Sequence, residues 1–297
     1  MQHPGSPCRP DGPILILTLD SFHKIREGEE RGYDPSSSMP DAGIPAACRE
    51  FLMAARAEVY RRLMNGEVVW EDSQREMGIN RHLKAGRDLG GSDPSARYLP
   101  ALHRYDGHFF DGLGEQGKAE FRQSRHHLLI LSALYGFVRP FEPVQYYTCQ
   151  FGEKNVSYGI WAEKNGISKV LAEYIRAHCI RRVFDFTACD VPAYHEIIDW
   201  EYVFRETGAD VLHCYHRLTG TDKALKFFGI FVRRRMLPAS PEELLAMQPG
   251  AVIDDILFSG MRLLKKSDPG SADDETLLAL IMGGENESGE FKTSALW

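Results

Sequence analysis

Four short apolar runs constrain the fold of this chain more than any other feature of its sequence. Each is bounded by polar or turn-forming residues, and they are residues 14–19, 127–134, 183–188 and 211–216. Runs of this length are typical of strands buried in a sheet. Between them, residues 44–63 and 161–179 show the apolar spacing of amphipathic helices. Strands that alternate with helices along the chain predict a mixed α/β fold, with a central mixed sheet and surrounding helices.

The distribution of turn-forming and acidic residues divides the chain into three segments. Residues 1–12, rich in Pro and Gly, are expected to be a flexible amino terminus. Residues 13–265 are expected to form one α/β domain, because 297 residues with 43% hydrophobic content suffice for a substantial core. Residues 266–297 carry Asp, Glu, Gly and Ser, which predicts an acidic, partly mobile tail.

The composition favours a cytoplasmic protein. No apolar run approaches the roughly 18 residues that a membrane span needs, and the first residues lack the apolar stretch of a secretory signal. The cysteines form no CxxC pair, which predicts reduced thiols at Cys8, Cys48, Cys149, Cys179, Cys189 and Cys214. A formal charge of -7 argues against a uniformly basic nucleic-acid-binding protein, but it is compatible with a local basic groove.

One motif gives the chain a family resemblance. The segment from Ser132 to Pro140 is Ser-Ala-Leu-Tyr-Gly-Phe-Val-Arg-Pro and follows a predicted strand. A strand leading into Ser-x-Leu-Tyr-Gly-x-x-Arg-Pro is the pattern of the YaaA peroxide-stress family, which this chain resembles. The family also has a first strand leading into Ser-Pro-Ala-Lys, to which Ser21-Phe-His-Lys24 is similar.

Weaker parts of the resemblance lie on the carboxyl side of the motif. Tyr147 and Trp161 look like a family tyrosine and a helix-opening tryptophan. Ala188-Cys189-Asp190 is similar to a family strand that ends in Ala-Ser-Asp, with cysteine replacing serine. The resemblance covers roughly residues 14–237 and is strongest in the middle.

The resemblance implies a single YaaA-like domain that binds double-stranded DNA, contains a helix-hairpin-helix element and protects against oxidative damage. Some relatives belong to systems that install 7-deazaguanine bases in DNA, where the implied reaction converts a cyano group on the base to an amide. The cysteine at position 189 favours this branch. Other DNA-modification proteins are then expected as partners, and neither a membrane nor a cofactor is expected.

A serine and a lysine follow the first predicted strand, at Ser21 and Lys24. At this spacing they can share a hydrogen bond, so that a neutral lysine could act as a base or a charged lysine could hold an anion. The carboxyl ends of strands are also where α/β proteins place ligands. The alternative is an ordinary strand-to-loop turn with a solvated lysine.

Tyr135, Gly136 and Arg139 follow the second predicted strand. Glycine permits a tight turn, arginine offers a planar fork to a phosphate or a base edge, and tyrosine can stack on a base. The alternative is a β-turn in which Arg139 pairs with a carboxylate such as Glu142. The predicted base-binding residues are Tyr135, Gly136, Arg139, Tyr147 and Trp161.

Two cysteines are candidate nucleophiles. Cys189 and Asp190 follow the third predicted strand, and a Cys189 thiolate could attack a nitrile carbon while Asp190, Lys24 or a histidine moves protons. Cys149, two residues after Tyr147, is a rival nucleophile. For Cys189, the alternative is that it is simply a small buried apolar residue.

Two basic segments are predicted to contact DNA phosphates. The glycine-rich residues 112–119 resemble a hairpin between two helices, which binds phosphates through its backbone amides, and Lys118 adds charge there. The spacing is one residue too long, however, and a glycine-rich surface turn is the alternative. Residues 222–235 predict a basic helix with Lys226, Arg233 and Arg234, whose binding should weaken as salt rises. A solvated face of an ordinary amphipathic helix is the alternative.

The histidines predict no metal site. His126 and His127 are adjacent, and His213 and His216 are three apart, so the side chains of each pair should diverge on a strand. No pair has the spacing of zinc ligands on a helix face.

Three functions remain open from the sequence. The first is an enzyme that hydrates the nitrile of 7-cyano-7-deazaguanine in DNA to the amide, with Ser21, Lys24 and Cys189 supplying the chemistry. The second is a non-enzymatic DNA-binding protein of peroxide-stress protection. The third is a glycosidase-like enzyme that processes free nucleosides or nucleobases.

Overall fold

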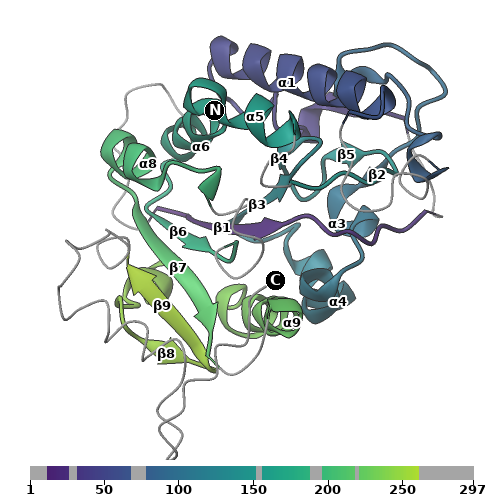
Figure 1. The fold of residues 1–297 in the computed structure, drawn as a ribbon. Coiled ribbons are helices and arrows are strands. Elements are labelled where there is room, and N and C mark those ends of the chain that lie inside the picture. The colour runs from purple at the N-terminus through teal and green to yellow at the C-terminus, as the bar shows by residue number, and fades with distance from the viewer. Residues whose placement is uncertain are drawn as a thin grey trace, which may run out of the picture.

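The computed structural model in Figure 1 describes residues 12–26, 32–67, 78–151, 156–187, 196–217 and 221–260. Their main feature is a seven-stranded sheet with the order β4-β3-β1-β6-β7-β9-β8. Its strands are β1 (Ile14–Leu19), β3 (His127–Ser132), β4 (Gly136–Val138), β6 (Arg182–Asp185), β7 (Asp210–His216), β8 (Val252–Ile253) and β9 (Ile256–Gly260). A second sheet pairs β2 (Leu99–Pro100) with β5 (Pro143–Val144).

The large sheet is mixed, as predicted. Strands β3, β1, β6 and β7 are parallel, whereas β4, β9 and β8 join antiparallel at the two sides. Strand β1 is central, and all six of its residues are buried. A parallel strand covered on both faces needs a continuous apolar sequence, which explains the run Ile-Leu-Ile-Leu-Thr-Leu.

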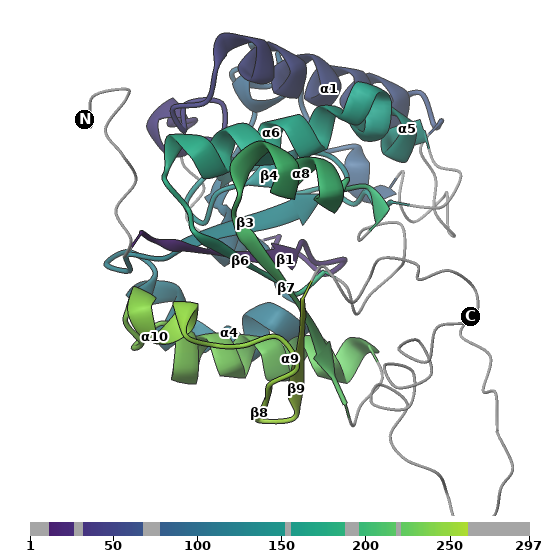
Figure 2. The same cartoon turned by 90° about the vertical axis from the view of Figure 1, so that its left-hand side faces the viewer.

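Helices cover both faces of this sheet (Figure 2). One layer holds α1 (Ala46–Met64), α5 (Val156–Ala162), α6 (Gly166–Ala177) and α8 (Trp200–Thr207). The other holds α4 (His108–Glu120), α9 (Thr221–Phe231), a π-helical turn η4 (Val232–Met236) and α10 (Pro241–Leu245). Shorter pieces are α3 (Ala101–Arg104) and the 3-10 turns η1 (Pro35–Ser37), η2 (Arg87–Leu89) and η3 (Glu163–Asn165). In α1 the predicted apolar face is buried at Leu52, Ala55, Val59 and Leu63.

Helices α4 and α9 lie side by side because two glycines allow close approach of their backbones (Figures 1 and 2). A Cβ at Gly112 would overlap the carbonyl oxygen of Lys226. On α9, a Cβ at Gly229 would overlap the carbonyl oxygen of Phe109. The glycine-rich sequence of α4 therefore serves helix packing.

The predicted helix-hairpin-helix element is not confirmed. Residues 108–120 form α4, which is interrupted where Gly114 has φ 64° and ψ 172°. A positive φ is readily adopted by glycine and costs other residues conformational energy. Glycines 112 and 117 pack against α9 and the π-helical turn that follows it, so two of the three glycines in this segment have a packing role.

Among the described residues, no helix is both long and apolar enough to cross a membrane. Cys48, Cys149 and Cys214 are thiols outside any disulfide. Cys179 is disulfide-bonded, so the prediction that every cysteine is reduced is wrong at this position.

Candidate functional site

A cluster of polar side chains lies where β1 and β3 end. Asp20 directly follows β1, and its backbone N–H donates to the carbonyl of Leu131 on β3 at 2.8 Å. Lys24 then forms an isolated antiparallel bridge with Tyr105, the residue after α3. Ser132 is the last residue of β3. The carboxyl ends of two neighbouring parallel strands thus bring these groups together, at the edge where α/β proteins place ligands.

Lys24 is the most unusual member of this cluster. Its side chain is 1% exposed and its Nζ lies 3.8 Å from Oδ2 of Asp20, whose side chain is 3% exposed. The ammonium donates to the carbonyl of Ser21 and lies 4.2 Å from the ring centroid of Tyr147. Burial lowers the pKa of Lys24 below its usual value of 10.5, and the charge of Asp20 opposes that change. A larger fraction of the amine is therefore neutral than in an exposed lysine.

The hydroxyl of Tyr147 is the centre of a hydrogen-bond network. It donates to Oδ2 of Asp20 at 2.8 Å. Because a phenol has one proton, the contacts with Ser132 Oγ at 2.7 Å and Tyr105 Oη at 2.9 Å must be donated to Tyr147. Burial and the charge of Asp20 raise the pKa of Tyr147, so it stays a neutral donor. The network points its protons toward the Asp20 carboxylate.

Cys149 lies beside this network. It is 3% exposed and outside any disulfide. A Cys149 thiolate would raise the pKa of Lys24, so the two side chains are within electrostatic range of each other. A thiol within electrostatic range of a buried amine and carboxylate can serve as a nucleophile, with the amine as proton carrier and the carboxylate as base.

Ser21 contributes differently from the prediction. Its backbone carbonyl, rather than its hydroxyl, accepts the proton of Lys24. The hydroxyl lies against Gly107, where α4 begins, and a Cβ at Gly107 would overlap it. The predicted Ser–Lys contact is therefore present through the main chain.

Asp20 and Tyr105 were not predicted as site residues. The signal for Asp20 is a carboxylate directly after a buried strand, where ligands are commonly bound. Nothing in the local sequence pattern distinguishes Tyr105 from a core aromatic residue, since its role depends on the contact with Tyr147 across 42 residues.

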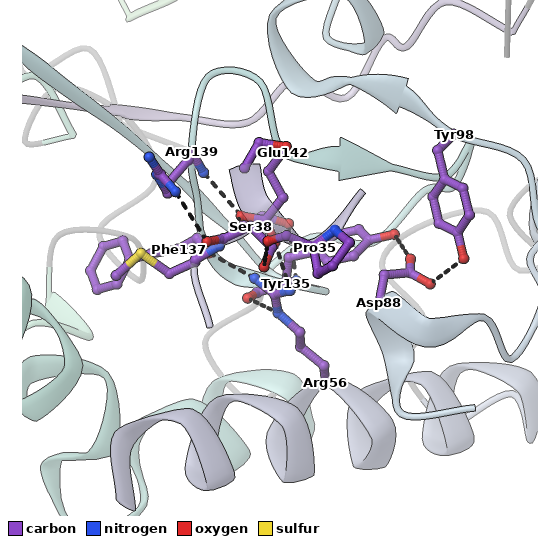
Figure 3. A network of polar contacts seen from close by, with 12 residues as sticks. Pro35, Ser38, Arg56, Asp88, Tyr98, Tyr135, Phe137, Arg139 and Glu142 are labelled. Carbon is purple, nitrogen blue, oxygen red and sulfur yellow. Dashed lines mark hydrogen bonds and ion pairs between the residues drawn. The ribbon is translucent and has the colours of Figure 1, made fainter. Parts of the chain in front are cut away.

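The turn after β3 is buried, and Figure 3 shows Tyr135 of this turn bonded to Asp88 and Arg56. The Tyr135 hydroxyl donates to Asp88 at 2.6 Å, and its ring is fully buried. Gly136 has φ 67°, and a Cβ there would press on the ring of Trp161. Trp161, also fully buried, donates from Nε1 to the carbonyl of Ala133 at 2.9 Å. Tyr135 and Trp161 therefore hold the turn in this structure, and neither ring is presented to a ligand.

Arg139 lies at the opposite end of β4 from this turn. Its Nη1 is 3.4 Å from the Ser36 carbonyl oxygen and 3.3 Å from that of Ser38, and its backbone N–H donates to Glu142 (Figure 3). Strand β4 runs antiparallel to β3, so Arg139 is carried away from the end of β3 where Ser132 lies. The structure does not bring Arg139 to Lys24. The arginine that pairs with Glu142 is Arg56, at 2.7 Å with both side chains fully buried.

A second buried polar group lies within the sheet. His213 Nδ1 contacts Asp185 Oδ2 at 2.7 Å with both side chains fully buried. The other carboxylate oxygen, Oδ1, accepts from the backbone N–H and the hydroxyl of Thr187. The Trp200 indole and the imidazole pack nearly perpendicular to each other, with their ring centroids 5.2 Å apart. An aspartate inside the apolar run Val183-Phe-Asp-Phe is the sequence signal of this pair.

The histidine pairs diverge as predicted. His126 contacts the carbonyl of Ala239, whereas His127 contacts the hydroxyl of Tyr174 on α6. His213 meets Trp200 on α8, and His216 stacks against α9. Within the described ranges, no three His, Cys, Asp or Glu side chains are grouped to hold a metal ion.

The predicted phosphate-binding residues lie on the layer of α4 and α9, in different surroundings. The Lys118 side chain is 8% exposed and pairs with Glu115 at 2.8 Å. Lys226 is half exposed and pairs with Asp111 at 2.5 Å. Arg233 is half-buried over the break at Gly114, and Arg234 is exposed. Lys226 and Arg234 are therefore the two that a polyanion can reach most directly.

The predicted pair Cys189 and Asp190 lies outside the described residues.

Comparison with known proteins supplies the identification. A family model described as peroxide stress protein YaaA matches residues 44–201, more than half of the chain. This chain belongs to the YaaA peroxide-stress family. The resemblance inferred from residues 132–140 is confirmed, because the motif lies inside the matched range. Asp20 and Lys24 precede that range.

Two similar proteins show how much sequence this chain shares with its relatives. A UPF0246 protein of Methylibium petroleiphilum is 30% identical over 135 residues, covering 44% of this chain and 51% of that protein. A UPF0246 protein of Legionella pneumophila strain Lens is 32% identical over 92 residues, or 28% of this chain and 36% of that protein. The matched part thus spans about half or less of the length of these UPF0246 proteins.

Proposed function

We propose that this YaaA-family protein is a DNA base-modification enzyme that hydrates the nitrile of 7-cyano-7-deazaguanine in DNA to the amide. One observation carries the proposal: Lys24 and Asp20 form a buried pair at the carboxyl end of β1, and the buried thiol of Cys149 is within electrostatic range of Lys24. A nitrile carbon is attacked by a thiolate, and its nitrogen must gain protons as the carbon–nitrogen bond order falls. The three side chains match these needs.

The reaction can be followed atom by atom. Neutral Lys24 takes the Cys149 proton, and the thiolate adds to the nitrile carbon. The Lys24 ammonium returns the proton to the nitrile nitrogen, which gives a thioimidate. A water adds to the thioimidate carbon and gives one proton to Asp20, which passes it to the nitrogen, so that the carbon then bears OH, NH2 and the cysteine sulfur. As the carbon–sulfur bond breaks, the remaining hydroxyl proton passes through Asp20 to the sulfur, which restores the Cys149 thiol and releases the amide, so that the net change is R–C≡N + H2O → R–CONH2.

Tyr147 acts on Asp20 as a positioning residue in this scheme. Its hydrogen bond to Oδ2 holds the carboxylate 3.8 Å from Lys24. Burial strengthens the electrostatic effect of each group on the others because water does not screen them. The side chains of Asp20 and Lys24 are 3% and 1% exposed, so a base has to displace covering groups to reach them. In duplex DNA the base must also leave the stack, as for other enzymes that modify bases.

The DNA part of the proposal is supported by Lys226 and Arg234, which lie on exposed surface in the layer of α4 and α9. Neutralised phosphates release counterions, so binding to double-stranded DNA should fall steeply between low and moderate salt.

The test is a direct assay with purified protein. A duplex oligonucleotide with one 7-cyano-7-deazaguanine is incubated with the enzyme, digested to nucleosides and analysed by mass spectrometry. We expect a nucleoside heavier by one water. Lys24→Met should lower the rate by about 10²–10⁴-fold, the usual contribution of a general acid–base group. Lys169→Met on α6 removes an exposed amine elsewhere and is the matched control.

Two results would count against the proposal. The first is no mass change with wild-type protein on duplex and single-stranded substrates. The second is an equal rate for Lys24→Met and Lys169→Met, which would remove the cluster from the chemistry.

A second candidate function is favoured by the family match, since the matching model describes a peroxide stress protein. In that case the protein binds DNA and limits oxidative damage without chemistry on the base. Two results together would favour this function. The wild-type protein would hydrate no nitrile, and Lys24→Met would protect plasmid DNA from peroxide as well as wild type does.

A further inference from the structure

One phenylalanine of α9 is exposed where its two neighbours are buried. Phe228 and Phe231 are 0% and 2% exposed and pack in the core, whereas Phe227 is 43% exposed. A single exposed apolar side chain is common and needs no explanation. The surroundings of Phe227 set it apart from such cases.

The Phe227 ring is stacked against the imidazole of His216. Its centroid lies 4.7 Å from that of His216, and the two rings are within 28° of parallel. The histidine supports one face of the phenylalanine, which fixes the orientation of the ring at the surface. Exposed lysines Lys223 and Lys226 lie four residues and one residue before it on α9. The result is an oriented aromatic surface beside cationic groups.

The stack of Phe227 and His216 lies at the same edge of the sheet as the candidate site. Leu17, Asp185 and His213 are aligned across β1, β6 and β7. His216 lies three residues further along β7, and Asp20 lies three residues after Leu17, one residue past the end of β1, so the register places both at the same edge of the sheet. Two strand spacings separate them, about 10 Å. A chain of nucleotides that places one base at Asp20 can thus place a neighbour at Phe227.

We infer that Phe227, supported by His216, is a stacking platform for an unpaired nucleobase that flanks the modified base, with Lys223 at the adjoining phosphate. The inference rests on the proposed action on DNA and specifies the form of DNA that is held. Aromatic stacking combined with cationic groups along the backbone is how proteins hold single strands. In a duplex the faces of the bases are covered by their neighbours, so the ring can act only on a strand that is locally opened.

The experiment compares two exposed phenylalanines. Fluorescence anisotropy is measured with a labelled single-stranded oligonucleotide and with its duplex, for wild type, Phe227→Leu, Phe227→Trp and Phe204→Leu. Phe204 is 40% exposed and lies on α8, in the other helical layer (Figure 2). We expect Phe227→Leu to weaken single-strand binding about 5- to 100-fold, as for loss of one base–aromatic stack. Phe227→Trp should retain binding, and Phe204→Leu should match wild type.

Unchanged single-strand affinity in Phe227→Leu would overturn the inference, and so would an equal loss in Phe204→Leu. Thermal melts of all variants separate loss of stacking from loss of folding. A loss in Phe227→Leu that Phe227→Trp does not restore would also count against a platform. The affinity measurement needs no turnover, so a wild-type protein that loses single-strand affinity in Phe227→Leu but hydrates no nitrile would count against the proposed chemistry alone.

Discussion

Lys24 shows how burial and one neighbouring charge set the chemistry of a side chain. Its surroundings lower its pKa through desolvation, and Asp20 partly restores it. The sequence indicated Lys24 and Ser21, because both follow a buried strand. It also indicated Tyr147 and Cys149 as candidates, but not that the Tyr147 ring lies against Lys24, since a contact across more than 120 residues depends on the path of the chain through α4 and β3. The placement of Arg139 depends in the same way on the antiparallel return of β4.

The Asp20→Asn variant tests this description of Lys24. Removing the carboxylate removes a contribution that raises the pKa of Lys24, so the pKa should fall further below 10.5. Nuclear magnetic resonance titration of isotope-labelled lysine side chains measures it, with Asp41→Asn, an exposed carboxylate elsewhere, as the control. A rise in pKa in Asp20→Asn would contradict the description.

The same shift predicts a direction for stability. In the window between the lowered pKa of folded Lys24 and 10.5, the unfolded chain binds more protons than the folded one. Through this group, the free energy of unfolding should therefore rise with pH across that window. Lys24→Met should remove that part of the pH dependence in denaturant titrations, and an unchanged slope would contradict it.

At the scale of elements, the apolar runs were a sound guide to β1, β3, β6 and β7, and the apolar spacing to α1 and α6. The antiparallel strands β4 and β9 were missed. Strand β9 is only five residues long and has three apolar residues in a row, too few to stand out in the sequence. The turn before it contains Asp254 and Asp255, both with positive φ, a conformation uncommon for residues other than glycine. The glycines of α4 suggested a DNA-binding hairpin, whereas two of them lie at the contact with the helical segment formed by α9 and η4.

Gly112→Ala tests the contact between α4 and α9. An added Cβ would overlap the backbone of Lys226, and overpacking of this kind costs about 1–3 kcal/mol. Gly159→Ala in α5 is the matched control, since a Cβ there meets nothing within 4 Å. It should be neutral or stabilise the fold by up to about 1 kcal/mol, because alanine favours helices. Equal melting temperatures for the two variants would contradict the packing role.

At the scale of the whole molecule, one buried ion pair joins the outer helix α1 to the sheet. Arg56 on α1 pairs with Glu142 at 2.7 Å and donates to the carbonyls of Tyr135 and Phe137 (Figure 3). Glu142 also accepts from the backbone of Met39. The segment around β4 is thus held from several directions, by side-chain and backbone groups of Arg56, Glu142 and Met39.

Arg56→Ala should lower the free energy of unfolding far more than the loss of a surface ion pair does. Removing one partner of a buried pair leaves a charge without compensation and costs about 3–5 kcal/mol. Arg61→Ala removes an exposed arginine of α1 that pairs with Glu58, which should cost at most about 1 kcal/mol. Denaturant unfolding measures both, and comparable losses would show that the buried pair does not hold α1 to the sheet.

The central claim is that Cys149 is the nucleophile in the cluster with Lys24 and Asp20. The most direct measurement is the initial rate of nitrile hydration, on one oligonucleotide, for Cys149→Ala and Cys189→Ala. We expect the rate to fall at least about 10²-fold in Cys149→Ala, while Cys189→Ala keeps most of the wild-type rate. Full activity in Cys149→Ala, with the loss in Cys189→Ala instead, would contradict it.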